Sequence, residues 1–275
     1  MDSVIREPEN SASIFINTES GEVLHDADAA CPTRVMRAVQ AGKVDVVMEW
    51  IVAGGHPNAV AFSGDSMVHF AAEANQLEMV NKLIAAGADV NIANPDGGAA
   101  LHAAAAAGYN LIVDTLIAGK ANVAQTVGPP EDATALLMAA VGGHDLVVQA
   151  LLRAKANADD RDGQGATALI QAAAQGHAKV VLLMLTAGCR TDIVDSFQMT
   201  ALDVVTKEVP QTAIARTLIA HMVGSQCKVD GLVARSDLNG ALGTVTEFVE
   251  AKGRFAVKFD SGEVVAVKPS NLSRA

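Results

Sequence analysis

The chain has 275 residues, of which 50% are hydrophobic, and 31 acidic against 20 basic side chains give it a formal net charge of −11. This length and apolar content suffice to bury a core and exclude a wholly disordered chain. The positive mean hydropathy of +0.27 comes mostly from alanine in short amphipathic segments. No apolar run reaches the ~20 residues of a transmembrane helix, so membrane insertion is not expected. Because residues 1–227 carry a charge of −12, the partner is expected to be a protein with a basic surface rather than a nucleic acid.

Residues 1–27 are expected to form a tail that leads into the rest of the chain. Residues 1–12 are expected to be disordered. The apolar segments Ile14–Ile16 and Val23–Leu24 flank the turn-forming residues Thr18–Gly21, a pattern that predicts a β-hairpin. The acidic first residues lack the features of a signal or transit peptide, so cytoplasmic or nucleocytoplasmic residence is expected.

Between residues 28 and 223 the sequence repeats itself six times, with successive starts 33, 33, 35, 33 and 33 residues apart. The longer step is absorbed by a proline-rich loop at Gly128–Asp132. Each repeat predicts a tight turn, a short helix, a break at glycine and a longer helix. The six repeats start at Thr33, Ser66, Ala99, Thr134, Thr167 and Thr200.

These repeats resemble the ankyrin repeat in their period and in landmarks at fixed offsets. The repeat from Ser66 reads SMVHFAAEANQLEMVNKLIAAGADVN, beside the family's T-P-L-H-x-A-A and closing G-A-D-V-N. The resemblance implies a mainly α fold, a solenoid in which neighbouring repeats share their cores and the terminal repeats act as caps. Repeat one, with Arg34 and Met36 in place of Pro and His, suits the N-terminal cap.

The residue at the break between the two helices is expected to be left-handed, a conformation that residues other than glycine adopt only with strain. In repeat two this residue is Asn75, the commonest substitute. Lys120 and Lys155 stand where other hairpins have glycine, which makes the hairpins that follow them the weakest part of the alignment. The break glycines are Gly42, Gly108, Gly143 and Gly176.

Beyond residue 227 the hydrophobic period changes from helical to alternating. Strands are predicted at Gly243–Val249, Arg254–Phe259 and Val264–Val267. Residues 228–275 are expected to be a separate domain, joined through a short hinge at Gly224–Ser225.

This C-terminal segment resembles an SH3-like module found beside ankyrin repeats in proteins of unicellular eukaryotes. The resemblance implies a small all-β barrel that follows the solenoid. Phe255, Val257 and Phe259 alternate onto one face, where burial in the barrel is a simpler account than an aromatic cage. The landmarks that carry the resemblance are Leu238-Asn239-Gly240, Gly243, Gly253-Arg254, Asp260–Glu263 and Lys268-Pro269-x-Asn271-Leu272.

The histidines do not predict a catalytic or metal site. His69 and His102 occupy the family's T-P-L-H position, and His144 and His177 follow the central glycine. In the family the first position ties one repeat's turn to the next, and the second has a similar tethering role. Whole repeats separate these four side chains on a rigid array, so they cannot converge on one ligand.

Other motifs of catalysis or cofactor binding are also missing from the sequence. It has no nucleophile elbow, P-loop, HExxH helix or GxGxxG turn after a strand, so neither an enzyme nor a cofactor is expected. The pair Asp159-Asp160 fits hairpin-turn chemistry better than a Ca²⁺ site. Cys31, Cys189 and Cys227 are expected to be reduced thiols, with Cys189 accessible at a hairpin tip.

A partner-binding surface is predicted from the resemblance, because ankyrin proteins usually meet partners on the concave face of hairpin tips and first helices. Phe62 and Phe197 stand out, because an aromatic at a hairpin tip is unfavourable unless something covers it. Packing of each ring under its own hairpin is the alternative. Carried onto this chain, the surface comprises Phe62, Ser63, Asp65, Glu73, Pro95, Asp96, Ala106, Glu131, Val141, Gln164, Gln175, Phe197, Met199 and Lys207.

The sequence therefore predicts a non-enzymatic adaptor that grips a protein on this face and is a monomer on its own. The alternative is a permanent structural subunit of a large assembly. An enzyme with a site in the groove is disfavoured by the missing catalytic motifs.

Overall fold

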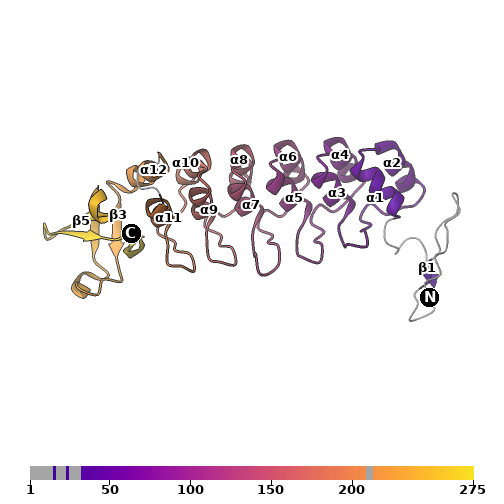
Figure 1. Ribbon diagram of the computed structural model, residues 1–275. Coiled ribbons are helices and arrows are strands. Elements are labelled where there is room, and N and C mark those ends of the chain that lie inside the picture. The colour runs from indigo at the N-terminus through magenta and orange to yellow at the C-terminus, as the bar shows by residue number, and fades with distance from the viewer. Residues whose placement is uncertain (1–14, 17–22, 25–31, 209–212) are drawn as a thin grey trace.

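The computed structural model describes residues 15–16, 23–24, 32–208 and 213–275. Its helices form an elongated array of two rows, with the hairpins that join successive repeats projecting from one side (Figure 1). Residues 1–12, which are expected to be disordered, and the predicted turn at Thr18–Gly21 are outside the described residues.

Each repeat contributes one helix to each row, in the order predicted. The first helices are α1 (Thr33–Gln40), α3 (Met67–Glu73), α5 (Ala100–Ala107), α7 (Ala135–Val141), α9 (Ala168–Ala174) and α11 (Ala201–Glu208). The second helices are α2 (Val44–Val52), α4 (Leu77–Ala85), α6 (Asn110–Ala118), α8 (Asp145–Arg153), α10 (Ala178–Thr186) and α12 (Ala213–Met222).

Side-chain caps mark where the first helices α3, α7, α9 and α11 begin. The hydroxyls of Thr134 and Thr167 accept hydrogen bonds from the backbone N–H three residues on, each at 3.4 Å, which satisfies a donor that the helix leaves free. At α11, Thr200 and Asp203 cap each other reciprocally, with N–H to oxygen distances of 3.1 and 3.2 Å. These contacts explain the repeat's preference for Ser or Thr at its start.

The predicted left-handed breaks are confirmed, with φ of 66°, 75°, 70° and 80° at the four break glycines and 56° at Asn75. Lys120 and Lys155 adopt the same conformation, with φ of 68° and 69°. Both hairpins therefore keep the family geometry without glycine, at a cost in backbone strain. The alignment holds through repeats three and four.

The core runs along the array between the two rows. Paired alanines such as Ala104 and Ala105 are fully buried where adjacent first helices meet, because small side chains let the backbones approach. Larger residues, such as Leu151 and Val181, are buried on the second helices. Since each layer is completed by the next repeat, stability is shared between neighbours.

The described residues also form two antiparallel sheets. The predicted N-terminal strands are present as β1 (Phe15–Ile16) and β2 (Val23–Leu24), with Phe15 opposite Leu24. The C-terminal sheet has the order β6-β5-β4-β3-β7. Its strands are β3 (Gln226–Val229), β4 (Leu242–Val249), β5 (Arg254–Phe259), β6 (Val264–Val267) and β7 (Leu272–Arg274).

The three predicted C-terminal strands are confirmed as β4, β5 and β6, and β3 and β7 were missed. Phe255, Val257 and Phe259 are buried as expected, and Phe248 packs edge-on against Phe255 with ring centroids 4.9 Å apart. Among the described residues β6 and β7 form no ladder with each other, so the expected barrel is not closed by hydrogen bonds.

The residues of the expected hinge, Gly224–Ser225, are hydrogen-bonded to the C-terminal sheet. The N–H of Gly224 donates to the carbonyl of Val245 at 2.8 Å, and the N–H of Val245 donates to that of Ser225 at 3.0 Å. Buried residues of α12, such as Leu218, belong to the same apolar cluster as those of the sheet, such as Val245. Because β3 begins four residues after α12 ends, the sheet is held against the last repeat.

Candidate partner-binding surface

Carboxylates fix the shape of the hairpins that carry the predicted surface. Asp162 Oδ1 accepts the backbone N–H groups of Gln164 and Ala166, each at 2.9 Å. In the next hairpin, Asp195 Oδ1 accepts those of Phe197 and Met199 at 2.8 and 2.9 Å. Asp is suited to this turn because its side chain replaces a backbone acceptor.

Successive hairpin tips are also bonded to one another. The N–H of Gly128 donates to the carbonyl of Asp96 at 2.6 Å, and that of Ser196 to the carbonyl of Gln164 at 2.9 Å. Between them, Gly163 donates to Glu131 at 2.8 Å. The tips of repeats three to six thus form one hydrogen-bonded strip, which holds the predicted residues in fixed relative positions.

Most of the predicted residues are exposed along this strip and the adjoining first helices. Phe62 is 99% exposed and Phe197 75%, so Phe62 is not packed under its hairpin. Met199 is half-buried, and the side chain of Lys207 lies outside what the structure describes. The other exposed members are Ser63, Glu73, Pro95, Asp96, Ala106, Glu131, Val141, Gln164 and Gln175.

Asp65 is more committed to the fold than the sequence indicated. It is half-buried, accepts a hydrogen bond from Asn94 Nδ2 at 2.9 Å and lies 3.6 Å from His69 Nε2. The Asp65 carboxylate is therefore already bonded within the fold, and Asp65 is expected to attract a basic partner through its charge rather than by direct contact.

Sequence reasoning missed three apolar side chains beside this surface. Phe70, Ala103 and Met138 are half-buried and lie three residues before Glu73, Ala106 and Val141, on the same faces of α3, α5 and α7. They give the surface an apolar component in its central repeats. The helical i, i+3 spacing from the predicted residues was the signal that would have found them.

Acidic side chains dominate the charge of the surface. Glu73, Asp96 and Glu131 are exposed. Arg161, at the base of a hairpin, donates to the carbonyl of Gly165 at 2.8 Å and to that of Val194. Because the guanidinium of Arg161 is hydrogen-bonded to the backbone, the described side chains of the strip present net negative charge.

The histidines mostly have the predicted tethering role. His102 Nδ1 accepts the N–H of Ala99 at 3.0 Å, and its Nε2 lies 2.8 Å from the carbonyl of Gln125 in the next hairpin. Burial lowers the pKa of His102 below its ordinary value of 6.5. His144 and His177 bond through Nε2 to carbonyls of the preceding repeat, each at 2.9 Å.

His69 departs from this pattern. It pairs with Asp65, and its buried Nδ1 has no hydrogen-bond partner among the described residues. Within those residues no group of three or more His, Cys, Asp or Glu side chains is placed to hold a metal ion.

The expected accessibility of Cys189 is wrong. The residue is 5% exposed, and burial raises the pKa of its thiol to about 12, because a thiolate is disfavoured away from water. Its neighbour Arg190 donates its N–H to Asp159 Oδ1 at 2.8 Å, a bond between successive hairpins that explains Asp159 without a metal.

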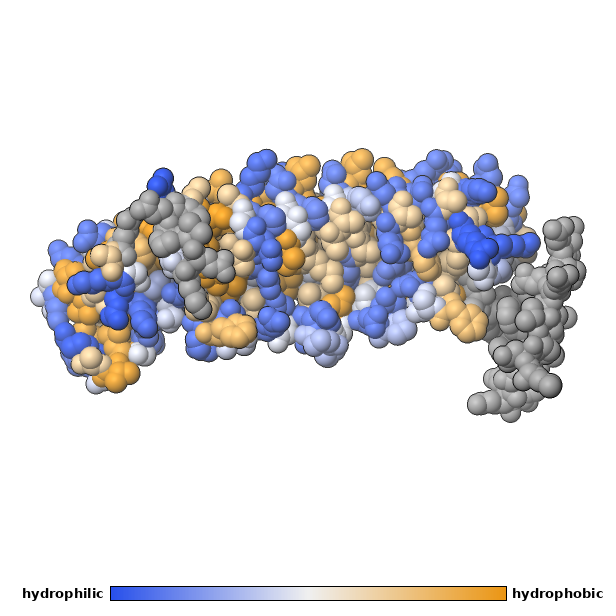
Figure 2. Space-filling view, in the orientation of Figure 1, coloured by the Kyte–Doolittle hydropathy of each residue, from blue (hydrophilic) through white to orange (hydrophobic). Residues whose placement is uncertain are grey.

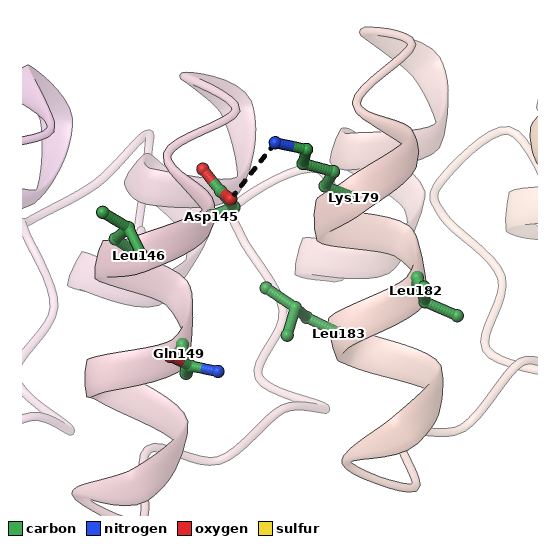
Figure 3. A pocket seen from close by; sticks show the side chains of 6 residues that line it. All are labelled: Asp145, Leu146, Gln149, Lys179, Leu182 and Leu183. Carbon is green, nitrogen blue, oxygen red and sulfur yellow. Dashed lines mark ion pairs between the residues drawn. The ribbon is translucent and has the colours of Figure 1, made fainter.

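A shallow groove lies away from the predicted surface, between α8 and α10 in the second row (Figure 3). Leu183 points from α10 towards α8, and Asp145 and Lys179 form an ion pair of 3.9 Å at one end. The remaining lining residues are Leu146, Gln149 and Leu182.

None of the described helices has the length and apolar character needed to cross a bilayer.

The comparison with family models identifies the repeats independently of the geometry. The model described as "Ankyrin repeats (3 copies)" matches residues 35–127, 119–195 and 136–230. No curated protein matches the chain. Since the matched residues make up more than half of the sequence and the two-row helical array agrees with the match, the chain belongs to the ankyrin repeat family.

Proposed function

We propose that this chain is a non-enzymatic adaptor that binds a protein with a basic surface along its hairpin tips and first helices. Ankyrin repeats are protein–protein interaction modules, and the specific surface is our inference. The observation that carries it is the hydrogen-bonded strip of tips, which displays the carboxylates of Asp96 and Glu131. A preorganised surface binds with less loss of conformational entropy than mobile loops do.

Two kinds of contact along this surface support a protein partner. Exposed Phe62 and Phe197 near its two ends offer aromatic anchors. The acidic side chains between them favour Lys and Arg of a partner and raise the rate of association. No cofactor is part of the proposal, and reduced thiols fit a cytoplasmic or nucleocytoplasmic site of action.

The C-terminal sheet is proposed to be an SH3-like module that makes a second contact. Its five antiparallel strands support that resemblance. Because the junction is hydrogen-bonded, the two contact surfaces are held in a defined relation, which increases the effective concentration for a second contact with the same partner.

A permanent place in a large assembly is the second candidate. Val233, Leu242 and Val264 are exposed on the C-terminal module, and Figure 2 shows hydrophobic surface at that end of the molecule. Apolar surface that stays exposed in an isolated protein is typical of obligate contacts. In that case the module, rather than the hairpin strip, holds the chain in place.

Charge reversal tests the proposal against this alternative. Quantitative capture from the native cell would compare the wild type with three variants. These are Glu73→Lys/Glu131→Lys on the hairpin side, Val264→Glu on the C-terminal module, and Asp45→Lys/Glu49→Lys on the second helices as matched control. The proposal expects partners to be lost selectively from the first variant. Equal recovery with both variants would contradict it, and loss only with Val264→Glu would favour the permanent subunit.

A further inference from the structure

The second helices carry an ordered pattern on their outer surface. The second residues of α2, α4, α6, α8 and α10 are exposed and lie at equivalent places on successive repeats. Leu111 and Leu146, in the middle of the row, are each 60% exposed. In chain order these residues are Asp45, Glu78, Leu111, Leu146 and Lys179.

Charge along the rest of this row changes sign in the same direction. The leucines thus lie where the acidic half meets the basic half. Helices α2, α4 and α6 carry Asp45, Glu49, Glu78 and Asp114 against Lys82, whereas α8, α10 and α12 carry Arg153, Lys179 and Arg216 against Asp145.

The groove between α8 and α10 adds apolar surface beside Leu146. Leu182, 53% exposed, and Leu183 line it with Gln149. The ion pair of Lys179 with Asp145 spans 3.9 Å, and the Lys179 side chain is 86% exposed. A pair so exposed is weak, so the ammonium group of Lys179 remains available to a second carboxylate.

We propose that this row is a self-association face, on which two copies of the chain pair antiparallel about a two-fold axis between α6 and α8. When the second copy runs in the opposite direction, the acidic half of one row faces the basic half of the other. Leu111 of each copy then meets Leu146 of the other, and Glu78 meets Lys179. Two-fold interfaces need a patch that is complementary to itself in this way.

Charge complementarity selects a second copy as the occupant. Parallel stacking would place acid against acid, which is unfavourable. Burial of the exposed leucines adds a hydrophobic contribution to the free energy of association, which charged side chains alone would not supply. The sequence-based expectation of a monomer took no account of how charge is distributed along this row. The hairpin surface of the proposed adaptor remains free in such a dimer.

Sedimentation equilibrium of the full chain tests this inference, over protein concentrations from about 1 to about 100 μM. A dimer should accumulate with concentration. Because each copy contributes its own residue 146, Leu146→Glu places two carboxylates in the interface and should weaken dimerisation at least about tenfold. Val233→Glu, at an exposed apolar residue of the C-terminal module, is the matched control and should leave it unchanged.

The register is tested by charge reversal. Glu78→Lys and Lys179→Glu should each weaken the dimer, and the double variant Glu78→Lys/Lys179→Glu should restore it. All these side chains are exposed, and circular dichroism would verify that each variant is folded. A wild type that stays monomeric, a dimer insensitive to Leu146→Glu, or a double variant without rescue would overturn the proposal.

Discussion

The backbone N–H of Gly163 donates a hydrogen bond of 2.8 Å to the carbonyl of Glu131 and thereby joins the tips of two neighbouring hairpins. The contact is close enough that a Cβ on Gly163 would lie 1.8 Å from the carbonyl oxygen of Pro130. Glycine is therefore needed here for space. This close contact packs the proline-rich loop, which lengthens one repeat step, against the next hairpin.

Gly163→Ala is expected to displace the two tips and to lower the free energy of unfolding by roughly 1–3 kcal/mol, as overpacking does. The obstructing atom belongs to the backbone and cannot rotate away. Thermal melting of the variant should be compared with Gln164→Ala, an exposed neighbour at the same tip. Equal melting temperatures for the two variants would show that the tips are not tightly joined.

Phe62→Ala and Phe197→Ala are expected to weaken partner binding by about 2 kcal/mol, or about thirtyfold, with little change in melting temperature. The near-complete exposure of Phe62 leaves little packing to lose. Calorimetric titration with the purified partner and thermal melting of each variant give both quantities. A variant that melts several degrees lower yet binds normally would assign the ring to the fold.

His102 should make stability depend on pH. Because burial lowers its pKa in the folded state, the unfolded chain binds this proton more readily. Stability is therefore complete above about pH 6.5 and falls as pH decreases through the folded-state pKa. His102→Gln should reduce this loss between about pH 7.5 and pH 5 in urea unfolding. His56→Gln, at an exposed site, is the control, and identical pH profiles for the two variants would refute the assignment.

Residues 1–224 expressed alone should remain helical but melt at a lower temperature than the full chain. Truncation removes the sheet that shares an apolar cluster with α12 and both backbone bonds to Val245. Circular dichroism melting measures the effect. If the truncated chain melts with the full chain, the sheet is an independent domain, as the sequence suggested.

The repeated part of the fold was predictable because one period recurs six times. Break residues such as Asn75, and the cap at Thr167, follow from local backbone chemistry that a sequence displays directly. Lys120 and Lys155 show the limit of that reasoning. Their left-handed conformation belongs to the turn that ends the second helix, where the N–H groups of Ala121 and Ala156 donate to the carbonyls of Leu116 and Leu151. Without glycine, the sequence does not signal this turn.

The remaining misses involve contacts between distant segments. Strands β3 and β7 have four and three residues, too short to show a period, and they pair with each other across the sheet. Cys189 looked accessible at a hairpin because its burial depends on how successive hairpins pack. Phe70 and Met138 were missed because the sequence does not distinguish an apolar helix residue that is half-buried at the surface from one that is buried in the core.

Hydrogen exchange of the full chain with and without its purified partner, at equal chain concentration, tests the adaptor account most directly. The account predicts slowed exchange at the hairpin tips, residues 62–65, 95–98, 129–132, 163–165 and 196–199, and in first helices α3 to α9. Because chain concentration is held equal, self-association along the second helices does not contribute to the difference. Protection confined to the C-terminal sheet or to the second helices, with unchanged tips, would contradict it.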